Sequence, residues 1–328
     1  MNDELTNLAL LYYVDGLTQE ELSKRLGVSR ATVGRMLKRA QEEGIVEIRV
    51  RQNPRLSDEI ERSLIQRFGL KRAIIAPDHQ DVDKQRGLLG SMVAGYLDKT
   101  LKDGMIVAVG MGRNVSAVSD HVMSDHVIST APRKCTFVCA IGGSYRGGEI
   151  MNPDHISRRL AAQFGGESET LYAPQMVSNP QVLQWLIEND TVRQTLDKAR
   201  RADIAMIGIG DMSGDSNIIR MGWFTQTEIT QAKLAGTVGD LMGYDFIDIH
   251  GHNAATPMQG RVVGLSIDDL QRIPNVIAIA SETSKATAIL GALRTGVINT
   301  LATSVSNATA LLQMDDAISP RRRAKSRS

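Results

Sequence analysis

Residues 18–45, TQEELSKRLGVSRATVGRMLKRAQEEGI, predict two short helices joined by a tight turn. Thr18 followed by Glu21 forms a capping box, which satisfies two amides at the start of a helix. Gly27 interrupts the first helix, and Ser29 is placed to cap a second one. The second helix has an inward apolar stripe at helical spacing, formed by Val33, Met36, Leu37 and Ala40. The stretch therefore predicts a helix-turn-helix.

The opposite face of the second helix is basic and contains small residues, and no acidic residue occurs from Ser29 to Gln41. Small residues allow close approach, and Arg and Lys contact phosphates or guanine edges, so this face fits the major groove of DNA. The residues expected to contact DNA are Ser29, Arg30, Ala31, Thr32, Arg35, Lys38 and Arg39. An ordinary helical hairpin with a solvated basic face is the alternative. The two caps, the three-residue turn Leu26-Gly27-Val28 and the acid-free face together favour DNA binding.

The composition predicts a folded chain of two domains. The 328 residues are 42% hydrophobic and carry a net charge of +1, so any contact with DNA has to come from a local surface. Cys135 and Cys139 lie in an apolar run and are interpreted as reduced core residues. No apolar run approaches the ~20 residues of a membrane span, and the start lacks the basic region of a signal peptide. We expect a cytoplasmic protein without membrane contact.

Four segments are expected along the chain: a helix-turn-helix domain at 1–52, a linker helix at 53–71, an effector-binding domain at 72–318 and a disordered basic tail at 319–328. In the first, the alternating residues 46–51 are interpreted as a strand that forms a wing. The linker helix has a narrow apolar seam, formed by Leu56, Ile60, Leu64 and Phe68. The seam leaves two alternatives open, pairing of two chains or packing on its own domain.

From Arg72 onward, apolar strands alternate with helical patterns, which is typical of a parallel sheet covered on both faces. The expected strands are 73–76, 105–109, 135–141, 204–209, 246–249, 276–280 and 300–302. Glycine-rich turns follow three of them, at 110–114, 142–144 and 208–211. Ligands of such sheets bind at the carboxyl ends of the strands, where helix N-termini offer amides to an anion. We therefore expect a phosphate or a polyhydroxylated ligand there. The first turn lacks the third glycine of a dinucleotide fingerprint, so NAD is not expected.

Two charged residues also follow apolar runs, Asp240 in GTVGD and Lys285 at the first turn of a helix. A carboxylate accepts hydrogen bonds from sugar hydroxyls, and an ammonium neutralises a phosphate. A solvated acid and a surface lysine are the alternative interpretation. His250 and His252 alternate, but they have no evident third ligand, so no metal site is expected.

Six motifs follow one another along nearly the whole chain before the basic tail. They are LLYYVDGLTQEELSKRLGVSR (10–30), GIVEIRV (44–50), AVGMG (108–112), IGIGDM (207–212), AGTVGDLMGYDF (235–246) and ETSKATAILGALRTG (282–296). This ordered series resembles the SorC family of bacterial sugar-responsive transcriptional regulators, which includes the DeoR-type regulators. The resemblance implies an N-terminal winged helix-turn-helix and a doubly wound, parallel-sheet α/β effector domain similar to sugar-phosphate isomerases. It also implies an oligomer, usually a tetramer, that binds a phosphorylated sugar.

By that resemblance, the phosphate-cradling turn falls on residues 110–116, the acid that contacts the effector on Asp240, and the basic residue on Lys285. The residues expected to bind the effector are Gly110, Gly112, Arg113, Asn114, Ser116, Gly142, Gly143, Gly210, Asp240 and Lys285. Relatives commonly have glycines before the lysine, whereas residues 281–283 are Ser-Glu-Thr in this chain. These residues add bulk and a negative charge, so an unphosphorylated polyol stays open as the effector.

The expected function is a DNA-binding regulator, a repressor, of a carbohydrate or polyol catabolic operon. Its partners would be double-stranded operator DNA and a sugar, polyol or sugar-phosphate effector, and it would act as a homodimer or homotetramer. No catalytic residue, cofactor or metal is expected. The alternative is a sugar-phosphate isomerase or deaminase with an accessory N-terminal domain, because the effector domain's fold also supports that chemistry.

Overall fold

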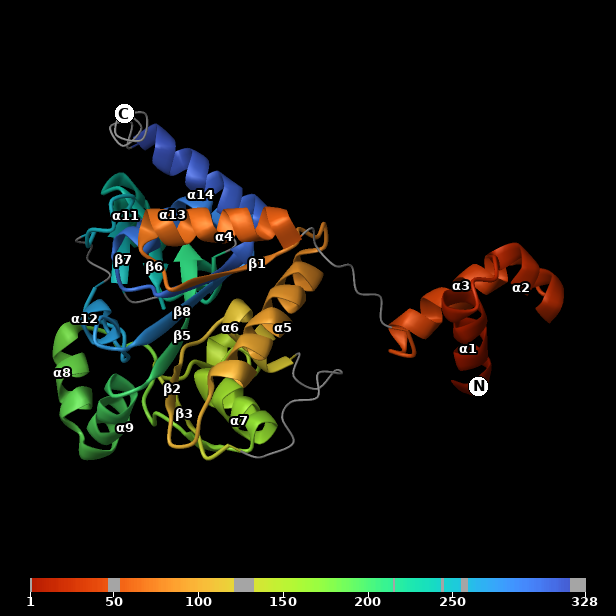
Figure 1. Cartoon of the computed structure of the whole chain (residues 1–328). Helices are drawn as coiled ribbons and strands as arrows, with labels where there is room; N and C mark the ends of the chain where they lie inside the picture. The colour runs from red at the N-terminus through yellow and green to blue at the C-terminus, as the bar shows by residue number, and fades with distance from the viewer. Residues whose placement is uncertain are drawn as a thin grey trace. The chain divides into compact units, whose positions relative to one another are not determined.

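The computed structural model describes residues 2–46, 54–120, 133–214, 216–242, 245–254 and 259–318. Contacts divide the chain into two compact units, Met1–Asn53 and Pro54–Ser328, drawn in Figure 1. The expected wing strand, apart from Val46, and the expected basic tail lie outside the described residues.

The first unit is helical, as its caps predict. It contains α1 (Asn2–Ala9), the π-helix η1 (Leu10–Val14), α2 (Gln19–Leu26) and α3 (Arg30–Glu42). The Thr18 hydroxyl accepts a hydrogen bond from the Glu21 amide at 3.2 Å, and the Glu21 carboxylate accepts one from the Thr18 amide at 2.8 Å. Gly27 ends α2 with a φ of 66°, a conformation that glycine adopts without strain. Ser29 caps α3 by accepting a bond from the Thr32 amide at 3.1 Å. The predicted helix-turn-helix is confirmed.

A small apolar core holds these helices together. It consists of Leu8, Leu22, Val33 and Leu37, which are each at most 4% exposed. Because Leu22 belongs to α2 and the last two to α3, this core fixes the angle between the two helices of the hairpin.

The second unit is built on a parallel sheet. Its strands are β1 (Arg72–Ala76), β2 (Ile106–Val109), β3 (Thr136–Cys139), β4 (Glu167–Glu169), β5 (Ile204–Asp211), β8 (Asn275–Ala280) and β9 (Thr300–Ser304). They lie in the order β1-β9-β8-β5-β2-β3-β4, and every pair is parallel. Two antiparallel strands, β6 (Thr237–Leu241) and β7 (Asp245–Asp248), extend from the end of β5. From β2 the chain proceeds outward to β3 and β4, then returns to β5 and continues in the other direction to β8 and β9. The winding therefore reverses between β2 and β5.

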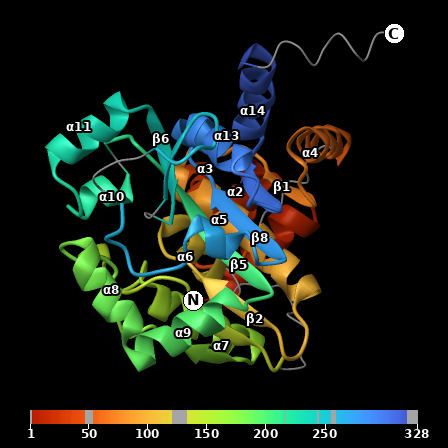
Figure 2. The ribbon, with the colours of Figure 1, turned by 90° about the vertical axis from the view of Figure 1, so that its left-hand side faces the viewer.

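Helices cover both faces of this sheet. Bounds along the chain are α4 (Pro54–Phe68), α5 (Val82–Thr100), α6 (Arg113–Asp120), η2 (Tyr145–Gly147), α7 (Pro153–Phe164), α8 (Pro180–Glu188), α9 (Asp190–Arg200), α10 (Asn217–Arg220), α11 (Gln226–Leu234), α12 (Ile267–Leu270), η3 (Thr283–Lys285), α13 (Ala286–Arg294) and α14 (Val305–Ile318). Helices α4, α9, α13 and α14 contribute to the core on one face, and α5, α6 and α7 to the core on the other (Figure 1). Figure 2 shows α10 and α11 grouped beside β6. The predicted parallel α/β domain is confirmed.

The expected linker helix, α4, packs on the second unit. Ile60 is 8% exposed and Leu64 is fully buried, and both belong to the core that also holds β1 and α14. Arg67, near the end of α4, forms an ion pair with Asp316 of α14. Of the two alternatives for the apolar seam, the structure shows packing on its own domain.

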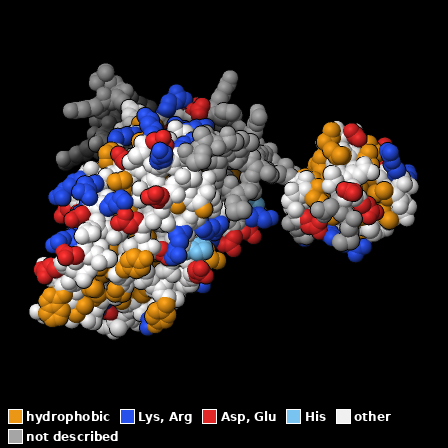
Figure 3. Space-filling model, turned by 90° about the horizontal axis from the view of Figure 1, so that it is seen from below, with side chains coloured by type: hydrophobic (Ala, Val, Ile, Leu, Met, Phe, Trp, Pro, Cys, Tyr) orange, Lys and Arg blue, Asp and Glu red, His pale blue; other side chains and the backbone are white. Residues whose placement is uncertain are grey.

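Charges of both signs are interspersed on the face of the second unit seen in Figure 3, in keeping with a net charge of +1. Cys135 and Cys139 are buried free thiols, as interpreted from the sequence, and burial raises the pKa of both. Among the described residues, no helix is long and apolar enough to cross a membrane.

Candidate DNA-binding surface and effector pocket

Helix α3 turns its basic face away from the core of the first unit. All seven residues expected to contact DNA lie on this face or at its start, and six are exposed while Thr32 is half-buried. Thr32 also orders the face, because its hydroxyl accepts a hydrogen bond from Arg35 Nη2 at 3.2 Å. Arg39 pairs with Glu43 at 2.6 Å, one turn further along. The face is therefore exposed and partly preorganised, and its contacts with DNA stay a prediction.

A second candidate site lies where the winding of the sheet reverses, at the carboxyl ends of β2 and β5. This is the usual place for a ligand in an open parallel sheet. A cavity of about 60 Å³ opens there. Its wall is formed by Met111, Gly112, Arg113, Asn114, Gly208, Ile209, Gly210, Asp211, Ser216, Ile218, Trp223, Asp240, Met242 and Lys285.

Six of the ten residues expected to bind the effector belong to this wall, and their role as effector ligands stays a prediction. The six are Gly112, Arg113, Asn114, Gly210, Asp240 and Lys285, whereas Gly110, Ser116, Gly142 and Gly143 are not part of the wall. The Ser116 hydroxyl donates to Ile150 O at 3.0 Å. The amides of Gly142 and Gly143 donate to Val263 O and Ala173 O, which ties their turn to other loops.

Asp240 and Gly210 approach each other closely on neighbouring strands. Asp240 lies within β6, opposite Gly210 of β5, and is only 2% exposed. A Cβ atom at position 210 would lie 2.0 Å from Asp240 Oδ2, so only glycine fits under this carboxylate. Asp240 is thus a buried acid of the wall. The alternative of a solvated acid is wrong.

Lys285 is largely buried, with 11% of its side chain exposed. Its Nζ donates to Ile209 O at 2.9 Å and lies 3.1 Å from Glu282 Oε2. The bond to Ile209 joins the start of α13 to the end of β5, the strand that carries Gly210 and Asp211. The alternative of a surface lysine is therefore wrong.

The glycine turn after β2 offers fewer amides than the sequence suggests. The Gly110 amide donates to Met206 O at 2.8 Å, and the Gly112 amide donates to Met151 O at 3.2 Å. Both bonds hold the turn against neighbouring backbone, so these two amides are already used within the protein.

Met242 is the wall residue with the most unusual backbone. Its φ of 59° places it in the left-handed region, and it is the one such non-glycine residue in the described part of the chain. Residues held this way cost about 1–3 kcal/mol and gather at ligand sites. The surrounding fold therefore holds Met242 of the cavity wall in an unfavourable backbone conformation.

His250 and His252 lie outside the cavity wall. Both are exposed in the turn after β7, where the Asp248 carboxylate accepts their backbone amides at 2.8 and 2.9 Å. Within the described ranges, no group of three metal-ligating side chains occurs.

Eight residues of the wall are absent from the list of expected effector-binding residues. Four of them, Met111, Gly208, Ile209 and Asp211, lie within two of the glycine-rich turns at which a ligand was expected. Ile218 and Trp223 lie in and after the short helix α10, whose place beside the cavity depends on tertiary packing. No local pattern in the sequence points to them.

An exposed basic helix in one unit and a cavity at the reversal point of a parallel sheet in the other are the two parts expected of a ligand-responsive DNA-binding protein. Family models agree with both parts. The Sugar-bind model, which describes a sugar-binding domain, matches residues 52–313, and the MarR family model matches residues 4–55. The chain belongs to the SorC/DeoR-type family of sugar-binding transcriptional regulators.

Relatives of known role cover nearly the whole chain. The transcriptional regulator LsrR of Escherichia coli (strain K12) is 31% identical over 314 residues, 95% of either chain. The sorbitol operon regulator of Klebsiella pneumoniae is 27% identical over 313 residues, 94% of this chain and 97% of that one. These relatives are transcriptional regulators, not enzymes.

Solved structures agree with the fold. The sugar-binding domain of a transcriptional repressor from Vibrio fischeri is 47% identical, with a TM-score of 0.73 over 79% of this chain and 99% of that one. Full-length SorC from Klebsiella pneumoniae is 26% identical, with a TM-score of 0.73 over 94% and 98% of the two chains. The protein is therefore a transcriptional regulator with a winged helix-turn-helix and a sugar-binding effector domain.

Proposed function

We propose that this regulator represses a carbohydrate or polyol catabolic operon in the cytoplasm and that a sugar, polyol or sugar phosphate in the cavity changes its affinity for the operator. The observation that carries the proposal is the meeting of Asp240 and Lys285 in one wall at the reversal point of the sheet. The carboxylate is placed to accept hydrogen bonds from hydroxyls, and the ammonium is placed to bind a polar or anionic group.

The operator would be read by two or more copies of α3, so we infer a homodimer or homotetramer. A helix of 13 residues covers few base pairs, and a symmetric pair would read half-sites about 34–36 Å apart. The operator would then contain an inverted repeat. The subunit contact would use surfaces other than the α4 seam, because Ile60 and Leu64 are packed within their own domain.

Effector binding would alter operator affinity by linkage. A ligand that prefers one arrangement of the subunits shifts operator affinity by the ratio of its affinities for the two arrangements. A typical coupling free energy of ~1–3 kcal/mol corresponds to about a 5–150-fold change.

Removal of the basic side chains of α3 should weaken operator binding in two distinguishable ways. Arg35→Ala should cost about 1–3 kcal/mol and relax sequence preference, because a bidentate Arg contact discriminates guanine. Lys38→Ala should weaken all sequences alike and flatten the salt dependence, because it would remove a phosphate contact. Titration on specific and scrambled duplexes separates these effects.

Lys233→Ala removes an exposed charge on α11 in the second unit and is the control. It should bind like the unmodified protein. If the Arg35→Ala, Lys38→Ala double variant also binds the operator with full affinity, α3 is not the reader.

Asp240→Asn should abolish the effector response while leaving ligand-free operator binding close to normal. The substitution keeps the size of the side chain but removes the charge that strengthens hydrogen bonds from hydroxyls. A thermal-shift screen of sugars, polyols and their phosphates would first identify the effector, since a ligand of the native state raises the melting temperature.

Calorimetry with the identified compound then compares Asp240→Asn with Asp190→Asn, which changes an exposed acid at the start of α9. Only the first variant should lose affinity. Equal affinity in both variants would place the effector somewhere other than this cavity.

A further inference from the structure

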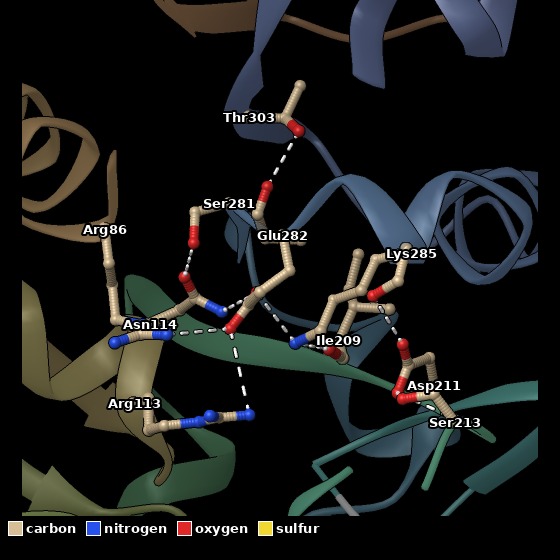
Figure 4. A network of polar contacts seen from close by, with 12 residues as sticks. Arg86, Arg113, Asn114, Ile209, Asp211, Ser213, Ser281, Glu282, Lys285 and Thr303 are labelled. Atoms are coloured by element: carbon tan, nitrogen blue, oxygen red, sulfur yellow. Dashed lines mark hydrogen bonds and ion pairs between the residues drawn. The ribbon is translucent and has the colours of Figure 1, made fainter. Parts of the chain in front are cut away.

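The carboxylate of Glu282 is the centre of a cluster of cationic and polar side chains beside the cavity (Figure 4). It accepts hydrogen bonds from Asn114 Nδ2 at 2.8 Å and from Arg86 Nη2 at 3.3 Å. Lys285 Nζ lies 3.1 Å away and Arg113 Nη2 4.0 Å away. The basic groups that point toward this end of the cavity therefore converge on a residue of the chain itself.

Glu282 is held firmly in this position. Only 12% of its side chain is exposed, and its backbone carbonyl accepts a hydrogen bond from Asn307 Nδ2 at 3.1 Å. Asn114 is oriented from the other side by the Ser281 hydroxyl at 2.7 Å. Burial by itself raises the pKa of Glu282, but the charge of Lys285 and the hydrogen bond from Asn114 outweigh it, and the pKa falls to about 2. The carboxylate is therefore ionised at every physiological pH.

The charges in the cavity wall and in this cluster balance among the described residues. The cations are Arg86, Arg113 and Lys285, and the carboxylates are Asp211, Asp240 and Glu282. A phosphate brought to this place would add up to two negative charges to a balanced, buried cluster. Its charge would be left without a new counter-charge, because Lys285, Arg86 and Arg113 already lie close to Glu282 in surroundings where charges are poorly screened.

Two amides of the expected phosphate-binding turn are also engaged within the protein, and the cavity is small. The amides of Gly110 and Gly112 donate to backbone carbonyls, so they are not offered to an anion. The cavity of about 60 Å³ lies far below the ~300 Å³ at which pockets for drug-sized ligands begin. A compact ligand is therefore favoured.

The remaining wall suits hydroxyl groups on a short carbon skeleton. The carboxylates of Asp211 and Asp240 are buried acceptors. Asp211 already accepts hydrogen bonds from Ser213 and Ser284, but a carboxylate has about four acceptor positions, so it can also accept from a ligand hydroxyl. Ile218, Trp223 and Met242 provide apolar surface for the C–H groups of a sugar or polyol. The wall thus combines acidic acceptors with apolar surface.

We propose, building on the proposed function, that the effector is a neutral sugar or polyol, and that Glu282 supplies from within the chain the negative charge that a phosphate would bring. Lys285, Arg86 and Asn114 then serve to hold Glu282 and shape the cavity. The ligand contacts the carboxylates of Asp211 and Asp240 instead.

Matched pairs of ligands test the proposal on the full-length protein. Calorimetry would compare sorbitol, mannitol, xylitol, glucose, fructose and ribose with the monophosphate of each. The neutral member of the binding pair should bind at least 10-fold more tightly than its monophosphate. Glu282→Gln removes the charge with little change of shape, so it should shift this ratio toward the monophosphate by 10-fold or more.

The matched control is Asp83→Asn, which removes the other carboxylate that bonds Arg86 but whose side chain is 90% exposed. It should leave the ratio unchanged. The ratio in the unmodified protein decides the question even if Glu282→Gln does not fold.

Operator titration with the same compounds separates the two proposals. Tighter binding of a monophosphate that also changes operator affinity would overturn the neutral-effector proposal and leave the proposed function standing. If the screen finds compounds that bind but none that changes operator affinity, the proposed function is wrong, and the neutral-effector proposal falls with it.

Discussion

Replacing Leu22 with Ala is expected to abolish operator binding while the effector unit stays folded. Leu22 is fully buried at the centre of the four-residue core that joins α2 to α3. Such Leu→Ala changes cost about 3–5 kcal/mol, because they remove buried contacts and leave a cavity. The free energy of unfolding of a unit of this size is only about 3–8 kcal/mol, so in the variant the first unit should be unfolded in a substantial fraction of molecules.

The two units can be followed separately. Both tryptophans, Trp185 and Trp223, belong to the second unit, so their fluorescence reports on the effector unit. We expect an unchanged unfolding curve by fluorescence and complete loss of operator binding in a titration. Leu10→Ala is the control, because this leucine of the same unit is 50% exposed and its loss should cost less than about 0.5 kcal/mol. Operator binding at normal affinity by the Leu22→Ala protein would contradict the role given to this core.

The second large effect concerns Asp245, whose substitution by Asn should stabilise the effector unit above neutral pH. Asp245 lies at the start of β7, and its Oδ2 accepts a hydrogen bond from the Ile267 amide at 2.6 Å. Burial, with a smaller contribution from the charges of Asp268, Asp240 and Asp269, raises the pKa of Asp245 to about 7.

The sign of the pH dependence follows from this raised pKa. Between pH ~4 and ~7 the folded protein holds a proton that the unfolded chain has lost, so the stability contributed by Asp245 falls as pH rises through this window. A shift of about three pKa units corresponds to a cost on the order of 2–4 kcal/mol above pH 7. Asn keeps an acceptor for the Ile267 amide without the charge. The free energy of unfolding of the variant should therefore exceed that of the unmodified protein by this amount at pH 8 and by little at pH 4.

Urea unfolding, followed by tryptophan fluorescence at a series of pH values, measures the difference between variant and unmodified protein. Acid effects common to both cancel in this difference. Asp190→Asn serves as the control, because its side chain is 78% exposed and its charge is not among those that act on Asp245, so its stability difference should change little across the series. A variant at Asp245 that is no more stable than the unmodified protein at pH 8 would show that the carboxylate is not destabilised by its surroundings.

The first unit was predictable because its signals act over short distances. The Thr18–Glu21 box and the Ser29 cap each join residues three apart, and both form as expected. Strand β6 was not expected, since GTVGD contains two glycines and glycine weakens a strand pattern. The structure explains one of them, because a Cβ atom at position 239 would lie 2.5 Å from Gly210 O and 2.7 Å from Ala288 Cβ.

The candidate site was predictable only in part. Glycine turns at strand ends led to Gly112 and Gly210 because the ends of parallel strands meet at one edge. The sequence shows the negative charge that Glu282 adds, but not its partner Arg86, which lies 196 residues away on α5. Whether such a charge repels a ligand or is held by the protein depends on partners that only the folded chain brings together.

The pairing of β1 with β9 has a consequence for the order in which the protein is made. Arg72 of β1 lies opposite Thr300 of β9, so β1 cannot pair until β9 has been synthesised. Helix α4 likewise cannot form its contacts with α14 until α14 has been synthesised. At about 5–20 residues per second, synthesis takes roughly 10–50 s to span this interval. The helix-turn-helix needs only local contacts and folds earlier. We therefore expect each nascent chain to pass through a period in which a finished DNA-binding unit is attached to a sensor that cannot yet close its sheet.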